Sequence, residues 1–79
     1  MADITLTPDW QAVAEGAGGA TFEPLSRNVR WFVATSTPTD TAGFSAPANK
    51  TVSMSLEAGE TLYLKGNGTA VVLADNAPA

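Results

Sequence analysis

The chain has 79 residues, a formal net charge of −4 and neither cysteine nor histidine. This length limits it to one domain, residues 1–79, and the missing side chains exclude disulfides, thiolate ligands and the most frequent protein ligand of transition metals. A domain this small buries only about 60% of its unfolded surface, so association with other chains is the remaining route to extra stability.

Positive charges are few, and this argues against two further classes of partner. The four cations are Arg27, Arg30, Lys50 and Lys65, too few for the basic surface that independent nucleic-acid binding requires. An acidic chain is also repelled by the anionic lipids of a membrane surface. The first residues lack the charged and apolar regions of a signal peptide, so we expect synthesis in the cytoplasm without secretion.

The first predicted elements are a strand and a helical turn. Residues 3–7 alternate polar and apolar side chains with period two, which predicts a half-buried strand. Thr7 and Pro8 then suit the N-cap and the first position of a helix, and the glycines within residues 16–19 would end it. The sequence therefore predicts one short helical turn near the N-terminus, packed over one end of a sheet.

Two strands and a long loop are predicted next. Residues 20–26 form the first strand, and Pro24, which cannot donate a ladder hydrogen bond, places it at a sheet edge or at a bulge. Residues 28–36 carry apolar side chains on both faces, which favours a central strand covered on both sides. Residues 37–50 are rich in turn formers and predict a long loop with Phe44 in its middle.

Strands dominate the C-terminal part of the chain. Residues 51–57 alternate again, and residues 61–65 and 69–75 predict two strands joined as a hairpin at residues 66–68. About six short strands with turn residues between them are typical of an antiparallel sandwich or a small barrel. We therefore expect an all-β fold, a small antiparallel β-sandwich or jelly-roll-like barrel that includes the N-terminal helical turn.

Three patterns suggest chemistry, and each has a plainer structural interpretation. Lys65 beside the glycines of residues 66–68 resembles a phosphate-binding loop, but in such a loop the lysine follows the glycines and a helix comes next. Glu57 and Glu60 flank a turn, which favours a solvated corner over a glycosidase pair or a weak Ca²⁺ site. Without His or Cys, a Ser or Thr nucleophile would need Lys50 or Lys65 as its base. We therefore expect no enzymatic activity, catalytic residue, cofactor or metal.

The aromatic side chains pose a problem of burial. Trp31 and Phe32 are adjacent on the predicted central strand and must face opposite ways, and Tyr63 faces away from the apolar side of its strand. Either a two-layer core covers every ring, or some rings lie against another chain. Arg30 beside them suits the rim of an interface, where arginine is enriched. The candidate interface residues are Arg30, Trp31, Phe32, Phe44 and Tyr63.

Three segments resemble small structural proteins of tailed bacteriophages. They are the opening MADITLTPDWQAVA, the strand NVRWFVATS with the Thr-Pro loop after it, and the closing LEAGETLYLKGNGTAVVLAD. The likeness covers most of the chain and lies in hairpin and corner residues. Its matching positions are scaffold positions: Ile4, Leu6, Gly59, Leu62, Tyr63, Leu64, Gly66 and Gly68. The resemblance implies a β-sandwich or jelly-roll module that assembles on capsids or tails.

The residues and the resemblance together favour a non-enzymatic structural protein of the virion. We expect a capsid decoration or cement protein that stabilises the particle by binding the major capsid protein, another virion protein or itself. A homo-oligomer, with a trimer as the first hypothesis, would close such an interface. The alternative is a tail- or fibre-associated module that recognises a host glycan or another tail protein, with Trp10 or Tyr63 exposed beside acidic groups.

Overall fold

The computed structural model describes residues 2–39 and 43–74 of the chain. Eight β-strands and no helix occur within these ranges. The strands are β1 (Ala2–Leu6), β2 (Gln11–Glu15), β3 (Gly18–Pro24), β4 (Val29–Ala34), β5 (Phe44–Ala46), β6 (Val52–Leu56), β7 (Thr61–Lys65) and β8 (Gly68–Ala74).

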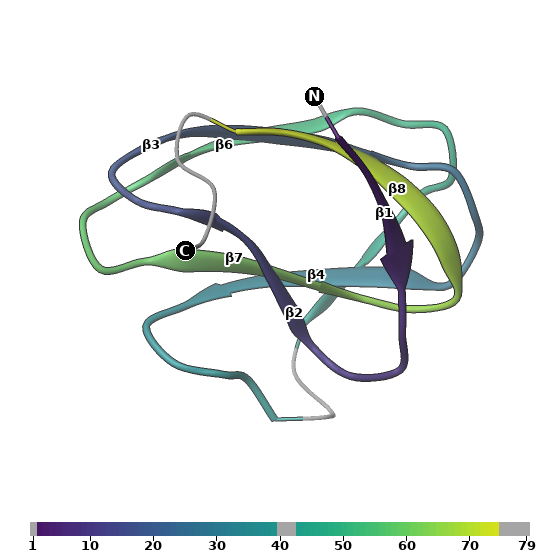
Figure 1. The fold of residues 1–79 in the computed structure, drawn as a ribbon, viewed down its shortest axis with the longest axis horizontal. Helices are drawn as coiled ribbons and strands as arrows, with labels where there is room; N and C mark the ends of the chain where they lie inside the picture. Colours follow the sequence, from purple (N-terminus) through teal and green to yellow (C-terminus); the bar gives the residue numbers. More distant parts are fainter. Residues whose placement is uncertain (1, 40–42, 75–79) are drawn as a thin grey trace.

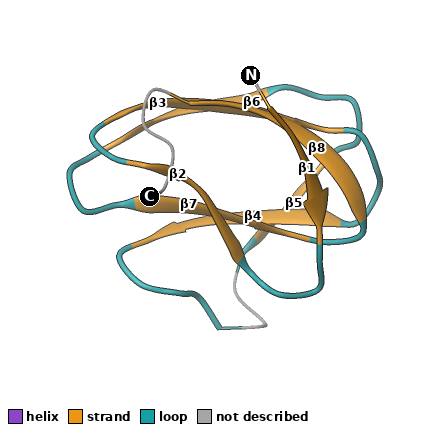
Figure 2. Cartoon of the chain, viewed as in Figure 1, coloured by secondary structure: helices purple, strands orange, loops and turns teal. Residues whose placement is uncertain are grey.

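Two four-stranded antiparallel sheets pack face to face (Figure 1, Figure 2). One sheet has the strand order β1-β8-β3-β6, and the other has the order β2-β7-β4-β5. The expected all-β class and the antiparallel sandwich are therefore confirmed. The alternative of a closed barrel is wrong, because each sheet ends in two edge strands.

The first strand pairs with the last, the second strand with the last but one, and so on toward the middle of the chain. β1 pairs with β8, β2 with β7, β3 with β6 and β4 with β5, so the chain forms one long antiparallel ribbon. Wrapping that ribbon adds the pairs β3–β8 and β4–β7. This is the jelly-roll arrangement of eight strands. Every connection except β4–β5 therefore crosses from one sheet to the other.

The helical turn expected near the N-terminus is wrong, because Gln11–Glu15 form strand β2. Thr7 Oγ1 accepts a hydrogen bond from the Asp9 amide at 3.3 Å, so the residues expected to cap a helix instead form the corner between β1 and β2. Strand β2 pairs with β7 and has a register shift in its middle. That irregularity buries Val13 and Ala14 together, which hid the alternation of a strand and imitated a helical face.

The expected hairpin between β7 and β8 is also wrong. The two strands lie in opposite sheets, and the turn at residues 66–67 carries the chain across the sandwich. The Gly66 amide donates a hydrogen bond to the Thr7 carbonyl at 2.9 Å, which ties this turn to the neighbouring β1–β2 corner. The turn therefore reverses the chain between the sheets without pairing the strands that it joins.

Strand β3 lies in the middle of its sheet, between β8 and β6, although Pro24 predicted an edge or a bulge. Pro24 is the last residue of β3, and β6 pairs with this strand only as far as Phe22. The Pro24 carbonyl accepts a hydrogen bond from the Asn49 amide at 2.7 Å. The nitrogen and the carbonyl of one strand residue point to the same side, so the Pro24 nitrogen also points to the side of β6. Because β6 ends its pairing at Phe22, the proline ring there lies beyond the end of β6.

The core lies between the two sheets and is built from one face of each strand. Within the described ranges, no polar or charged residue is fully buried. Alternate residues of a strand point to opposite faces, so a regular strand contributes every second side chain to the core. Strand β2 is the exception, because Val13 and Ala14 both join the core at its register shift. The largest fully buried side chains are Phe22, Leu62, Leu64, Val29 and Pro24.

Candidate interaction surface

Strands β4 and β5 bring four of the five predicted interface residues together. Arg30, Trp31 and Phe32 are consecutive on β4, and Trp31 lies opposite Phe44 of the edge strand β5. Sequence patterns assigned Phe44 to a loop, whereas the short β5 strand holds it in register with β4. These four side chains therefore share one edge of the sandwich.

The rings of Trp31, Phe32 and Phe44 form a cluster that we call the aromatic edge. The Phe44 ring centroid lies 5.1 Å from that of Trp31 and 6.0 Å from that of Phe32. Because Trp31 and Phe32 point to opposite faces of β4, Phe44 contacts rings from both faces at the side of the sheet. Phe44 is 56% exposed, whereas the Trp31 ring also approaches the core residue Phe22, at 6.4 Å. The aromatic edge thus extends from the core to solvent.

Tyr63, the fifth predicted residue, is buried by its own chain, with 9% of its surface exposed. It lies on β7, opposite Ala12 of β2 on one side and opposite Phe32 of β4 on the other. Its neighbours Leu62 and Leu64 are buried on the other face of the same strand. This chain therefore covers both faces of β7, and Tyr63 does not belong to the exposed part of the surface.

Trp10 contacts the end of β7 and the connection that follows β4. Its Nε1 donates a hydrogen bond to the Thr39 carbonyl at 2.8 Å, and Lys65 Nζ lies 4.9 Å from the Trp10 ring centroid, within the range of a cation–π contact. Sequence reasoning placed Trp10 on a helix and missed both contacts. They depend on segments far apart in the chain, β7 and the connection after β4, and no local pattern in the sequence carries that information.

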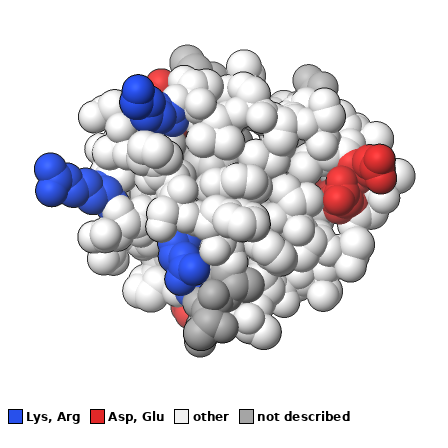
Figure 3. All heavy atoms as spheres, turned by 180° about the vertical axis from the view of Figure 1, so that it is seen from behind, with Lys and Arg blue, Asp and Glu red and all other residues white. Residues whose placement is uncertain are grey.

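The charged side chains divide between the two ends of the sandwich. Antiparallel strands alternate in direction, so the β1–β2, β3–β4, β5–β6 and β7–β8 connections lie at one end and the other connections lie at the opposite end. The first end holds all four cations and two carboxylates: Arg27, Arg30, Lys50, Lys65, Asp9 and Glu23. The opposite end holds four described carboxylates: Asp3, Glu15, Glu57 and Glu60. Figure 3 shows blue and red surface gathered mainly at opposite ends of one face.

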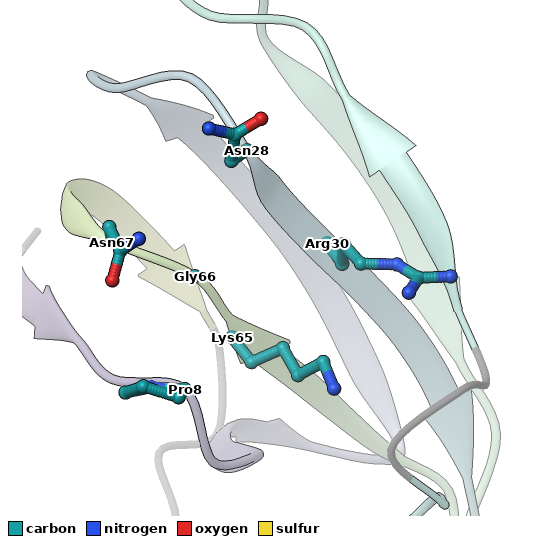
Figure 4. A pocket seen from close by; sticks show the side chains of 6 residues that line it. All are labelled: Pro8, Asn28, Arg30, Lys65, Gly66 and Asn67. Carbon is teal, nitrogen blue, oxygen red and sulfur yellow. The ribbon is translucent and has the colours of Figure 1, made fainter.

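A shallow hollow of about 240 Å³ lies at the basic end, lined by Pro8, Asn28, Arg30, Lys65, Gly66 and Asn67. Arg30 and Lys65 are cross-strand partners, and Figure 4 shows their side chains extending from β4 and β7 toward the same side. Arg30 Nη2 donates a hydrogen bond to the Gly43 carbonyl at 3.2 Å. The lining offers cations and amides but no carboxylate, so this hollow contains no acid–base pair. A strand follows the glycine turn here, whereas a phosphate-binding loop leads into a helix.

The carboxylates of Glu57 and Glu60 do not face each other across a cleft. Glu60 Oε1 accepts a hydrogen bond from the Glu57 amide at 2.8 Å, and the Glu60 amide donates to the Glu57 carbonyl at 3.0 Å. The Glu60 side chain therefore closes the β6–β7 turn. Across residues 2–39 and 43–74, no group of three or more side chains is arranged to hold a metal ion.

No family model, curated protein or solved structure matches the chain. The part of the chain that the structure describes contains no helix able to cross a membrane. Within the described residues, the aromatic edge with Arg30 is the arrangement best suited to binding another protein.

Proposed function

We propose that this chain is a non-enzymatic structural protein of a bacteriophage virion, made in the host cytoplasm and incorporated into the particle. In this role it is a capsid decoration or cement protein, which binds the major capsid protein, another virion protein or further copies of itself. The resemblance of its opening, central and closing segments to small phage structural proteins supports the assignment. The jelly-roll arrangement is compatible with it, since capsid proteins use that fold, but a fold alone does not assign a function.

The exposed aromatic edge is the observation that carries the proposal. Phe44 is 56% exposed beside Trp31 and Phe32, so a partner that covers these rings would remove apolar surface from water. Such burial contributes about 25 cal/mol per Å² before the costs of association are subtracted. The cluster offers this gain to a partner without any rearrangement of the core.

Arg30 adds a polar group at the same place. It lies on β4 directly before Trp31 and opposite Ser45 of β5, and it is held toward β5 by the hydrogen bond to the Gly43 carbonyl. Aromatic residues and arginine are enriched in protein interfaces, where a few side chains carry most of the binding energy. A cement protein needs only modest affinity at each such site, because many bound copies act on one shell.

The composition of purified particles tests this function. We expect virions produced from the genome that encodes this chain to retain it through density-gradient purification, at a copy number comparable with that of the major capsid protein. Quantitative mass spectrometry of the particles measures that ratio. Particles that contain no copy of the chain would contradict the proposal.

The same measurement separates the alternative role of a tail- or fibre-associated glycan-binding module. A tail component would be present in few copies for each particle, whereas a cement protein would be abundant. The geometry adds no support to glycan binding, because Tyr63 is buried and the Trp10 ring packs against Lys65. We therefore place the cement role first.

A further inference from the structure

The two sheets end in four edge strands, and these differ in how well they are protected. An edge strand presents unpaired backbone groups, and proteins commonly protect it with a charge, a proline, a bulge or a very short strand. β2 has a register shift, β5 has only three residues, and β1 carries Asp3. Strand β6 has none of these features: its five residues pair with β3 without a register shift and include no charge and no proline.

We propose that β6 is a self-association surface, which pairs antiparallel with β6 of a second copy of this chain about a two-fold axis at Met54. The sequence of the strand, Val-Ser-Met-Ser-Leu, supports a second copy as the occupant because it is nearly symmetric about its centre. In this register Met54 meets Met54 of the second copy, and each Ser53 meets a Ser55. Val52 meets Leu56, so like chemistry lies opposite like chemistry on both faces of the sheet.

The charges that flank β6 favour the same arrangement. Lys50 precedes the strand and Glu57 follows it, and both side chains are exposed. Continuing the register places Thr51 opposite Glu57 of the second copy, and Lys50 follows one position further along, on the other face of the extended chain. The two opposite charges therefore lie at the same end of the interface without a direct contact, and the two-fold axis repeats this at the other end. Figure 3, seen from behind the view of Figure 1, shows a largely uncharged centre between a mainly blue end and a mainly red end. A second copy related by the two-fold axis would place its acidic end beside the basic end of the first copy.

The pairing would join two four-stranded sheets into one continuous sheet of eight strands. Ser53 and Ser55 are exposed and Val52 and Met54 are half-buried in the single chain, so the contact covers surface that the chain leaves open. An interface in which the same patch meets itself is isologous and closes as a dimer. A two-fold interface of this kind predicts a dimer and not the trimer expected from the sequence. The β6 contact does not require that the chain belongs to a virion.

A pair of double variants tests both the contact and its register. Ser53→Lys with Ser55→Lys places lysine opposite lysine on both sides of the axis, and we expect the dimer dissociation constant to rise about tenfold. Ser53→Lys with Ser55→Glu places lysine opposite glutamate twice, so the dimer should be at least as stable as that of the unmodified chain. Thr5→Lys, on the exposed face of the opposite edge strand β1, is the control and should leave the dimer unchanged.

Sedimentation equilibrium over a range of protein concentrations measures the dissociation constants of the unmodified chain and the three variants, and thermal unfolding monitored by circular dichroism verifies that each variant folds. Hydrogen exchange should also show residues 52–56 becoming protected as concentration rises. A chain that stays monomeric at all concentrations would overturn the proposal. So would folded double variants with equal dissociation constants, because the two-fold register at Met54 requires them to differ.

Discussion

Phe44 and Phe22 carry the same ring in opposite surroundings. Phe22 is 1% exposed between the sheets, whereas Phe44 is 56% exposed at the aromatic edge. The free energy that each ring contributes to folding depends on the surface it removes from water. The burial of Phe22 therefore stabilises the folded chain, whereas the exposed ring of Phe44 is available to a partner.

Substitution separates these two roles. We expect Phe22→Ala to lower the free energy of unfolding by about 3–5 kcal/mol, because it leaves a cavity in the core. Phe44→Asp should change it by less than about 1 kcal/mol, as is usual at exposed positions, while reducing retention of the chain on virions. Urea denaturation and particle composition measure the two effects. A Phe44→Asp variant that unfolds as readily as Phe22→Ala would assign Phe44 to the core.

Gly66 marks a place where two backbones approach closely. Its φ is +149°, and a Cβ added there would lie 2.5 Å from the Asn28 carbonyl oxygen. Gly59 has a φ of +89° but open space where a Cβ would stand. Both positions have a positive φ that disfavours other residues, and of the two only Gly66 adds a steric clash.

The difference between the two glycines can be measured. We expect Gly59→Ala to cost about 1–2 kcal/mol of unfolding free energy from backbone conformation alone. Gly66→Ala should cost about 1–3 kcal/mol more, because the turn must move away from Asn28. Thermal or urea denaturation of the two variants gives the comparison. Equal losses would mean that the β7–β8 turn moves without penalty.

Central and edge strands of the two sheets should differ in their stability against local opening. β8 and β3 each pair with two strands in one sheet, and β7 and β4 do so in the other. The edge strands β1, β6, β2 and β5 pair on one side only. Local opening takes least free energy where fewest backbone hydrogen bonds and buried contacts are lost.

Hydrogen exchange should follow this division. At a protein concentration low enough to keep the chain monomeric, we expect the slowest amides in β3, β4, β7 and β8 and faster exchange in the four edge strands. Exchange monitored by mass spectrometry of overlapping peptides, or by nuclear magnetic resonance, measures it. The slowest exchange in β2 or β5 would contradict the observed strand order.

The whole molecule is held together by pairs that are distant in sequence. β1 pairs with β8, with Ala2 opposite Val72, so the two ends of the chain must meet before the outer part of that sheet forms. Closing a long loop costs entropy before the contacts it brings together can compensate. The nested pairing of the jelly roll imposes this cost on nearly every strand.

Refolding should therefore be slow for a chain of this size. We expect it to take milliseconds to seconds, the range of all-β domains dominated by non-local pairs. Stopped-flow fluorescence of Trp10 and Trp31 after dilution from urea measures the rate. Refolding complete within about 100 μs would show that local contacts govern the folding of this chain.

The sequence by itself determined the all-β class, most strands and the shortage of catalytic side chains. Period-two alternation is a local property, so β1, β4, β6 and β7 could be located without knowing their partners. Composition likewise excludes chemistry that needs histidine or cysteine. The neighbouring positions of Arg30, Trp31 and Phe32 on one strand followed directly from their order in the chain.

The tertiary structure alone decided which strands pair and which rings are covered. Residues 11–15 became a strand because β7 offered a partner, and their local pattern, with Val13 and Ala14 buried together, suited a helix as well. The turn at residues 66–67 joins opposite sheets because β7 and β8 each pair with strands far away in the chain. Tyr63 is covered and Phe44 exposed for the same reason: burial depends on neighbours that strand pairing brings together, and pairing is a property of the whole chain.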